Sequence, residues 1–162
     1  MKYNTEIQIG NQKIHIQSPA YFIADIASNH DGDISRAKEL IYLAKESGAN
    51  AVKFQHFKAE KIVSDHGFKS LGNKSSHQSQ WNESVFNTYK KYECNRIWTD
   101  ELVNTAKKAK IEFLTSPYDI EAIEELDKYL PAYKIGSGDI TWIQIIEEIA
   151  KKNKPVILST GA

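Results

Sequence analysis

Short, almost wholly apolar segments alternate along this chain with amphipathic helical ones, and the alternation limits its possible folds more than any other feature. The apolar segments are predicted strands that begin near residues 21, 51, 111, 132 and 155. Strands that are apolar throughout are buried on both faces, which is typical of parallel sheets with helical crossovers. The pattern therefore predicts an α/β fold with about five β-α units.

Helix signals fill the gaps between these strands. Asp33, Thr99 and Asp119 each precede an apolar repeat of helical period and are predicted N-caps. A further helix is predicted to begin near Thr141, after the turn Gly136-Ser137-Gly138. Each predicted strand is thus joined to the next by helical sequence.

The sequence divides into an N-terminal hairpin and a larger α/β domain. Residues 1–18 alternate apolar and polar residues around Gly10-Asn11-Gln12, which predicts a β-hairpin. Residues 19–162 hold the strands and helices, interrupted by a long polar insertion at 58–98. Such an insertion is either a lid over a site or a plain surface loop. Its apolar spacing predicts one short helix with Val85, Phe86, Tyr89 and Tyr92.

Polar residues collect where the predicted strands end, and this favours a (β/α)8 barrel over a doubly wound open sheet. They are Asp25, Asn29, Lys53, Gln55, Ser116, Lys134, Ser137 and Thr160. A barrel keeps its active site at this end of its strands. The first strand also lacks a glycine-rich dinucleotide fingerprint. Since a complete barrel needs about 250 residues, we interpret the domain as a partial (β/α)8 TIM barrel.

Two lysines inside otherwise apolar strands indicate an anion site. Lys53 and Lys134 would converge on one mouth and hold a phosphate or carboxylate, with the Ser116 and Ser137 hydroxyls beside them. Lys53 and Gln55 share a strand face, because side chains alternate with a period of two. The alternative is that the lysines extend outward to solvent, but an unpaired buried ammonium is costly.

Other ionisable residues carry less specific signals. Asp25 interrupts an apolar strand and could pair with a lysine, bind a sugar hydroxyl or act as an acid or base. His30 could be catalytic or could stabilise a turn, and His56 could face the cavity or the insertion. No histidine pair has metal-ligand spacing, so no metal site is predicted in this chain.

Composition excludes several classes of partner. The chain has 21 basic and 21 acidic residues, so no net field attracts nucleic acid or an anionic membrane. No apolar run has the length of a signal peptide or a membrane span. A single cysteine, Cys94, cannot form an internal disulfide, which is typical of a cytoplasmic protein.

Several motifs, in order, resemble the sialic acid synthase (N-acetylneuraminate synthase) family. They are the segments at 21–33, 48–55, 113–119, 131–139 and 154–161, of which Ala132-Tyr-Lys-Ile-Gly-Ser-Gly138 is the most diagnostic. The resemblance implies the N-terminal part of a TIM barrel that condenses phosphoenolpyruvate with N-acetylmannosamine or a related N-acetylated amino sugar. Carbon–carbon bond formation would release phosphate, in the biosynthesis of cell-surface polysaccharide.

The resemblance also implies parts that this sequence lacks. Family members use a divalent metal, manganese or magnesium, carry an antifreeze-like domain after the barrel, and are expected to form homodimers at full length. The metal ligands, the C-terminal half-barrel and the antifreeze-like domain are not in these 162 residues. The chain alone is therefore expected to be an inactive or weakly active fragment.

Individual positions match the family's motifs. Catalytic positions match at Asp25, Lys53, Lys134 and Asp139, and substrate-binding positions match at Gln55, Ser116, Tyr118 and Ser137. Both lysines and both serines fall at phosphoenolpyruvate-binding positions, whereas Asp25 and Asp139 stand where the family commonly has glutamate. Two alternatives stay open: a Schiff-base aldolase with Lys134 as nucleophile, and a non-catalytic anion-binding fragment.

Overall fold

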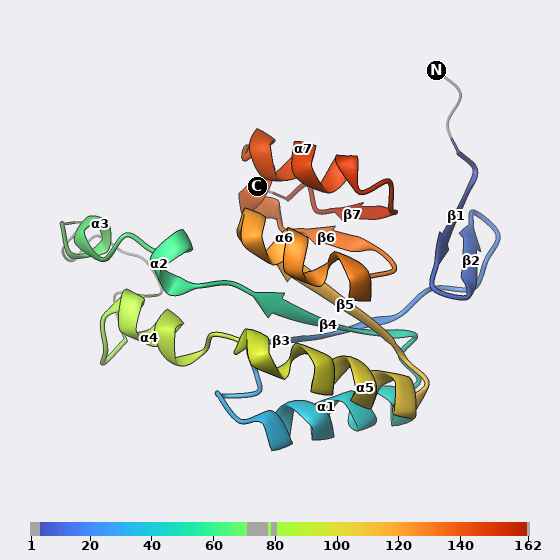
Figure 1. Cartoon of the computed structure of the whole chain (residues 1–162), viewed down its shortest axis with the longest axis horizontal. Coiled ribbons are helices and arrows are strands. Elements are labelled where there is room, and N and C mark those ends of the chain that lie inside the picture. The colour runs from blue at the N-terminus through green and yellow to red at the C-terminus, as the bar shows by residue number, and fades with distance from the viewer. Residues whose placement is uncertain (1–3, 71–77, 79–80, 162) are drawn as a thin grey trace.

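The computed structural model describes residues 4–70, 78 and 81–161, and it shows parallel strands alternating with helices (Figure 1). The strands are β1 (Glu6–Ile9), β2 (Gln12–His15), β3 (Ile23–Ala27), β4 (Ala51–His56), β5 (Glu112–Pro117), β6 (Tyr133–Ile135) and β7 (Val156–Leu158). The α-helices are α1 (Ile34–Glu46), α2 (Ala59–Ile62), α3 (Asp65–Ser70), α4 (Val85–Lys91), α5 (Thr99–Ala109), α6 (Ile120–Leu126) and α7 (Ile143–Lys151). Short 3₁₀ turns are η2 (Arg96–Trp98), η3 (Asp127–Tyr129) and η4 (Ser137–Asp139).

Strand register decides which side chains share a face. β3, β4 and β5 form one parallel sheet, and β6 pairs with β7 in a second. Paired residues point the same way, so Asp25 lies beside Lys53, and Gln55 lies beside Ser116. A register shift after Asp25 marks a bulge, and there Ala27 takes a left-handed φ of 50°. The five parallel strands lie where the sequence predicted them.

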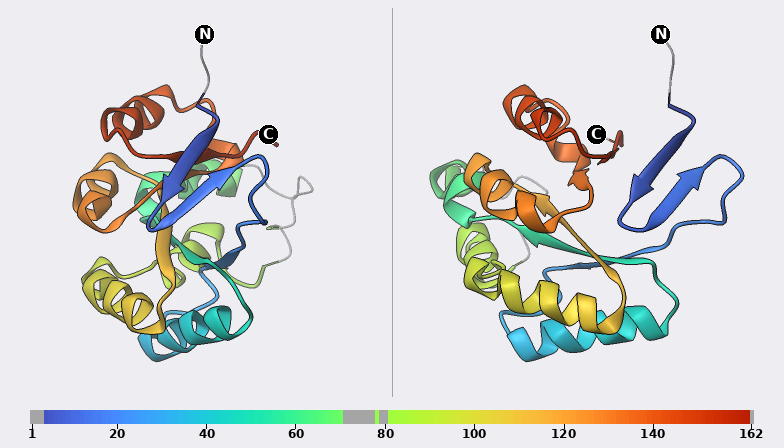
Figure 2. Two further views of the ribbon diagram at one scale, coloured as in Figure 1. Left: turned by 90° about the vertical axis from the view of Figure 1, so that its right-hand side faces the viewer. Right: turned by 45° about the vertical axis from the view of Figure 1, so that its right-hand side comes forward.

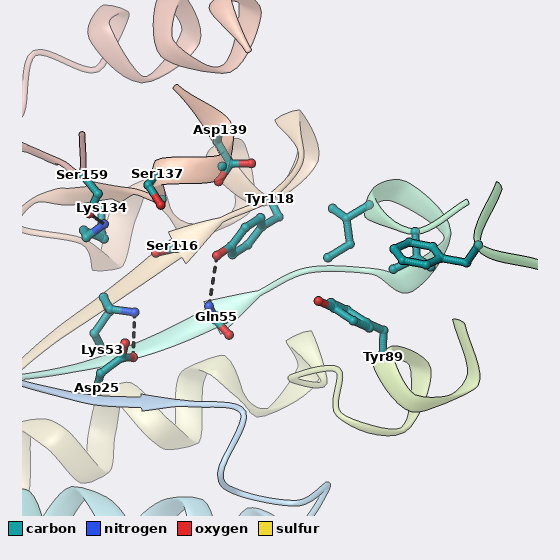
Figure 3. A pocket seen from close by; sticks show the side chains of 15 residues that line it. Asp25, Lys53, Gln55, Tyr89, Ser116, Tyr118, Lys134, Ser137, Asp139 and Ser159 are labelled. Carbon is teal, nitrogen blue, oxygen red and sulfur yellow. Dashed lines mark hydrogen bonds and ion pairs between the residues drawn. The ribbon is translucent and has the colours of Figure 1, made fainter. Parts of the chain in front are cut away.

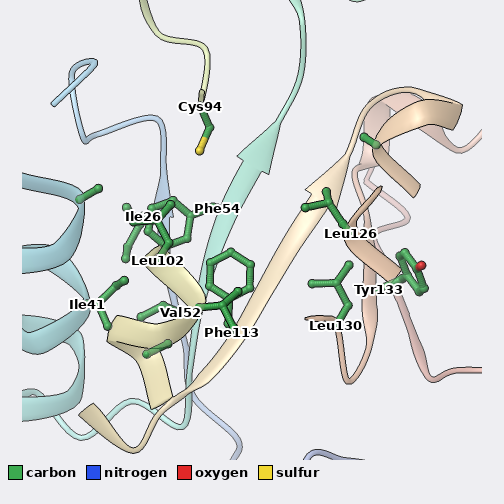
Figure 4. Close-up of a cluster of buried hydrophobic side chains, with 14 of the residues drawn as sticks. Ile26, Ile41, Val52, Phe54, Cys94, Leu102, Phe113, Leu126, Leu130 and Tyr133 are labelled. Atoms are coloured by element: carbon green, nitrogen blue, oxygen red, sulfur yellow. The ribbon is translucent and has the colours of Figure 1, made fainter. Parts of the chain in front are cut away.

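The main core lies between the strands and an outer layer of helices. Helices α1, α5, α6 and α7 cover one side of the strands (Figure 2). Val52, Phe54 and Phe113 project toward them and meet Ile41 and Leu102, all at most 4% exposed (Figure 4). Burial of one such side chain contributes about 1.5–3 kcal/mol. This layer holds the strands in place, so that their other face can carry polar groups.

The hairpin β1–β2 lies at the opposite end of the strands from the insertion helices α2, α3 and α4 (Figure 1). Ile9, which is 1% exposed, packs with Ala51, Leu114 and Ala132, the inward residues near the start of their strands. The turn of this hairpin requires glycine at position 10. The φ of Gly10 is +56°, and a Cβ there would lie 2.0 Å from Glu112 Oε1. The antiparallel pair lies where the sequence predicted a hairpin.

Two of the three predicted N-caps are confirmed. The Asp33 side chain accepts a hydrogen bond from Ser35 N, and that of Asp119 accepts one from Ala122 N, each at 2.7 Å. The prediction for Thr99 was wrong, because the turn η2 feeds directly into α5 and Thr99 is already helical. Its hydroxyl lies 3.3 Å from His56 Nε2 instead.

The polar insertion contains more helix than its sequence predicted. α4 matches the predicted amphipathic helix, whereas the short helices α2 and α3 were not predicted. Residues 71–77 and 79–80 of the insertion lie outside the described residues. Within the part of the chain that the structure describes, no helix combines the length and apolar character needed to cross a membrane.

Candidate functional site

All eight site residues predicted from the sequence line one cavity of about 520 Å³, hereafter the lysine cavity. They are Asp25, Lys53, Gln55, Ser116, Tyr118, Lys134, Ser137 and Asp139 (Figure 3). The cavity lies at the carboxyl ends of the strands and extends to Phe68 and Tyr89 of the insertion. The parallel register brings these residues together, because each lies within or just after a strand that runs in the same direction.

Lys53 provides the most buried charge of the cavity. Its side chain is 9% exposed, and its Nζ lies 2.7 Å from Oδ1 of Asp25, whose side chain is 57% exposed. Of the roles left open for Asp25, the structure shows the ion pair with a lysine, and this pair holds the Lys53 ammonium in place. A buried cation needs an anionic partner such as Asp25, and a bound anionic ligand could contact the same Lys53 ammonium.

Lys134 is the second cation of the cavity. Its Nζ donates to the Ser159 hydroxyl and to the backbone oxygen of Ile135, each at 2.6 Å. Burial and then repulsion from the Lys53 ammonium lower the pKa of Lys134, while Asp25 and Asp139 act in the opposite direction. Both lysines line the same cavity, as an anion site requires.

Asp139 lies across the cavity from the Asp25–Lys53 pair (Figure 3). Burial raises the pKa of its carboxyl, and the Lys134 charge partly offsets the shift. Its position depends on glycine: a Cβ at Gly136 would lie 2.9 Å from Asp139 Oδ2 and 3.6 Å from Tyr118 Oη. The turn η4, from Ser137 to Asp139, therefore folds tightly over the end of β6.

The remaining predicted residues line the wall of the lysine cavity. Gln55 Nε2 donates to Tyr118 Oη at 3.0 Å, which fixes the amide at the mouth of the cavity. Burial raises the pKa of Tyr118, so its hydroxyl stays protonated. Ser116 is 3% exposed, and Ser137 begins the turn η4. These groups offer neutral hydrogen bonds around the two cations.

Sequence reasoning missed two polar residues of the cavity. Ser159 lines it and receives the Lys134 ammonium, whereas the predicted Thr160 is not among its lining residues. The period of two along the last strand, from the inward Ile157, would have identified Ser159. Tyr89 also lines the cavity, but its place depends on how the insertion folds back.

The two histidines left open in the sequence lie outside the lysine cavity. His56 is fully buried on the helix side of β4, with Thr115 Oγ1 at 2.8 Å and Cys94 Sγ at 3.7 Å. Burial, with repulsion from Arg96 and His30, lowers the pKa of His56 to about 3. His30 stabilises its turn, since its Nδ1 accepts a hydrogen bond from Gly32 N.

A resident metal does not fit the described residues. No three His, Cys, Asp or Glu side chains among them lie close enough together to bind one. The two carboxylates of the lysine cavity face two ammonium groups instead. Two ammonium groups and two carboxyl groups in one cavity can bind an anion and transfer protons.

Comparison with known proteins places this arrangement in context. N,N'-diacetyllegionaminic acid synthase of Campylobacter jejuni is 40% identical over 140 residues, which are 86% of this chain and 41% of that protein. Human N-acetylneuraminate-9-phosphate synthase is 33% identical over 146 residues, which are 90% of this chain and 40% of that protein. The chain thus spans about two fifths of the length of these relatives.

A solved structure shares the fold. The N-acetylneuraminic acid synthetase of Leptospira borgpetersenii, in complex with citrate, superposes with a TM-score of 0.80 at 30% identity. The match covers 97% of this chain and 50% of the other. The α/β arrangement of parallel strands and helices is therefore that of a sialic acid synthetase.

The family model extends over most of the same sequence. It matches residues 40–162, which include β4, β5, β6 and β7 and the greater part of the lysine cavity. The relatives found by sequence and by structure include synthases of sialic, legionaminic and pseudaminic acids. On these matches, this chain belongs to the NeuB family.

Proposed function

We propose that this chain carries the phosphoenolpyruvate site of a nonulosonic acid synthase, on the first five strands of a (β/α)8 barrel. The enzyme condenses phosphoenolpyruvate with N-acetylmannosamine or a related N-acetylated amino sugar. The observation that carries the proposal is the pair Lys53 and Lys134, which face one polar cavity at the carboxyl ends of parallel strands. Phosphoenolpyruvate brings a phosphate and a carboxylate to such a pair.

The reaction couples bond formation to loss of phosphate. Carbon 3 of phosphoenolpyruvate attacks the carbonyl carbon of the open-chain sugar, and the carbonyl oxygen takes up a proton. Water adds to carbon 2 and loses a proton, after which the carbon–oxygen bond to phosphate breaks and the new hydroxyl passes its proton to the departing phosphate, leaving a ketone. Fixed cations in a cavity of low dielectric stabilise the negative charge that passes through these steps.

The two carboxyl groups suit the two proton transfers. Asp139, whose pKa is raised by burial, is the proposed proton donor to the sugar oxygen. Asp25 is the proposed acceptor of the proton from water, held by Lys53 at 2.7 Å. Both side chains are one carbon shorter than the glutamates common in the family. The acceptor is therefore proposed to be a relative of N-acetylmannosamine that reaches further into the cavity.

Neutral side chains are proposed to orient the two substrates. The Ser116 and Ser137 hydroxyls would donate to the phosphate or carboxylate of phosphoenolpyruvate. Gln55 and Tyr118 would contact the sugar, because their hydrogen bond lies at the mouth of the cavity. The citrate bound by the Leptospira synthetase supports a site for small polyanions in this fold.

The full-length protein is proposed to need more than this chain provides. A divalent metal, manganese or magnesium, is the expected cofactor, and a homodimer is the expected assembly. The described residues offer no metal cluster, and the chain spans about two fifths of its relatives' length. The 162-residue chain is therefore expected to bind phosphoenolpyruvate while showing little or no synthase activity.

Calorimetry and a phosphate-release assay test the proposal together. Titration of phosphoenolpyruvate into the chain should give saturable binding that a Lys53→Met, Lys134→Met double variant loses. Manganese with phosphoenolpyruvate and N-acetylmannosamine should release little phosphate from the 162-residue chain. Absence of phosphoenolpyruvate binding, or binding that survives the double substitution, would overturn the proposed site.

A Schiff-base aldolase is the second candidate, because the lowered pKa of Lys134 also favours a nucleophilic amine. Borohydride reduction in the presence of pyruvate separates the two. An aldolase would gain the mass of a reduced pyruvate adduct on Lys134. A synthase that condenses phosphoenolpyruvate would not, and its lysine should stay unmodified.

A further inference from the structure

A second cavity of about 410 Å³ adjoins the lysine cavity and differs from it in character. We call it the aromatic cavity, after Phe57, Trp81, Tyr89 and Tyr92, which line it. Gln55 and Tyr89 line both cavities, so these two residues stand at their junction. A molecule that occupies the lysine cavity near Gln55 can therefore extend into the aromatic one.

The rings of this cavity form a connected series. The Trp81 and Tyr89 centroids are 6.3 Å apart, those of Tyr89 and Phe57 are 5.7 Å apart, and those of Phe57 and Tyr118 are 6.1 Å apart. The series runs from the insertion to the hydrogen bond between Tyr118 and Gln55. Contacts at these distances hold each ring against its neighbour, which gives the cavity a rigid apolar wall.

Polar groups of the loop after β3 form the opposite side. The Ser28 hydroxyl is buried without a hydrogen-bond partner, and Asn29 also lines the cavity. The loop is strained, since Ala27 and Asp31 both have a left-handed φ near 50°. Non-glycine residues in this region cost about 1–3 kcal/mol each and cluster at ligand sites.

The charges of the aromatic cavity select against an anionic ligand. No lysine or arginine is among the described residues that line it, and the acidic residue that lines it, Asp31, already pairs with Arg36 at 2.9 Å. A phosphate group would lose its hydration without gaining a cation. An uncharged group with an apolar face and an amide fits, because a methyl group packs on rings while its amide reaches neighbouring polar side chains.

We propose that the aromatic cavity binds an uncharged acetamido group of the acceptor sugar, with Trp81 contacting its methyl. The inference rests on the proposed function and adds to it a subsite for one substituent. It also gives the polar insertion a role, since the insertion supplies Trp81, Tyr89 and Tyr92. A phosphorylated acceptor would gain nothing from this cavity.

Saturation-transfer NMR on the 162-residue chain tests the subsite directly. N-Acetylmannosamine, with phosphoenolpyruvate present, should receive its strongest saturation at the acetyl methyl protons. Trp81→Leu should weaken that methyl signal about three- to tenfold, the worth of one aromatic contact. Trp81→Phe is the matched control and should retain most of it. Mannosamine, which lacks the acetyl group, should give a weaker signal that Trp81→Leu does not change.

Phosphoenolpyruvate affinity, measured by calorimetry in parallel, separates this inference from the proposed function. Trp81 does not line the lysine cavity, so both Trp81 variants should bind phosphoenolpyruvate as the unsubstituted chain does. A methyl signal no stronger than that of the ring protons, or one unchanged by Trp81→Leu, would overturn the subsite. Loss of phosphoenolpyruvate binding with the methyl signal intact would overturn the proposed function and leave the subsite standing.

Discussion

Lys53 and Asp25 form an ion pair whose two members differ sharply in exposure. Nζ of Lys53 lies 2.7 Å from Oδ1 of Asp25, yet the lysine side chain is 9% exposed and the aspartate side chain is 57% exposed. Water therefore reaches the carboxylate more easily than the ammonium. An anionic ligand that enters the lysine cavity competes with Asp25 for the same cation, and the pair should respond asymmetrically to substitution.

Substitutions in this pair should change phosphoenolpyruvate affinity in opposite directions. Lys53→Met should weaken binding by about tenfold or more, because a hydrogen bond to a charged group is lost. Asp25→Asn should strengthen it by about two- to fivefold, since a competing negative charge is removed. Calorimetry at pH 7.5 measures both. Equal losses in the two variants would show that the pair is purely structural.

The second lysine predicts a pH dependence of ligand binding. Burial and the Lys53 ammonium lower the pKa of Lys134 below its ordinary value of 10.5. Phosphoenolpyruvate binds the protonated form, so its affinity should fall as pH rises through the lowered pKa. Calorimetry from pH 7.5 to 10 should show this decline, and Lys134→Arg, which stays charged, should flatten it. Constant affinity in the unsubstituted chain up to pH 10 would contradict the assignment.

The positions of the predicted site residues followed from two simple rules. Side chains alternate along a strand, so Lys53 and Gln55 could be placed on one face before the fold was known. Parallel strands end at one edge, so Ser116 and Lys134 could be placed near them. Both rules depend only on short, regular elements, and here the structure follows them.

The insertion could not be predicted in the same way. Tyr89 was correctly placed on a short helix, but helical spacing says nothing about which surface that helix packs against. Its contact with Phe57, at a centroid distance of 5.7 Å, depends on the fold of the whole insertion. Thr99 was misassigned for a related reason, because Asn95 caps a 3₁₀ turn that runs straight into α5.

Two glycines in one turn should differ in their tolerance of alanine. A Cβ at Gly136 would lie 2.9 Å from Asp139 Oδ2, whereas a Cβ at Gly138 would meet nothing within 4 Å. Gly136→Ala should displace Asp139, with a loss of about 1–2 kcal/mol in the free energy of unfolding. Gly138→Ala is the control and should change that free energy by less than about 0.5 kcal/mol. Equal effects of the two substitutions in urea titrations would contradict the contact.

His56 should make the folded state sensitive to mild acid. Its imidazole is fully buried against Thr115 and Cys94, and burial, followed by Arg96 and His30, lowers its pKa to about 3. The unfolded chain takes up a proton near pH 6.5, whereas the folded chain does not until about pH 3. Stability is therefore complete above pH 6.5 and declines as pH falls toward 3.

This linkage gives a measurable slope. Between pH 7 and pH 5, His56 alone should lower the free energy of unfolding by about 2 kcal/mol. His30, whose pKa burial also lowers, acts in the same direction. Urea titrations at the two pH values should show the loss in the unsubstituted chain and a smaller one in His56→Asn. Other titrating groups are common to both proteins, so they cancel in the comparison. Identical slopes would mean that His56 is accessible to protons in the folded state.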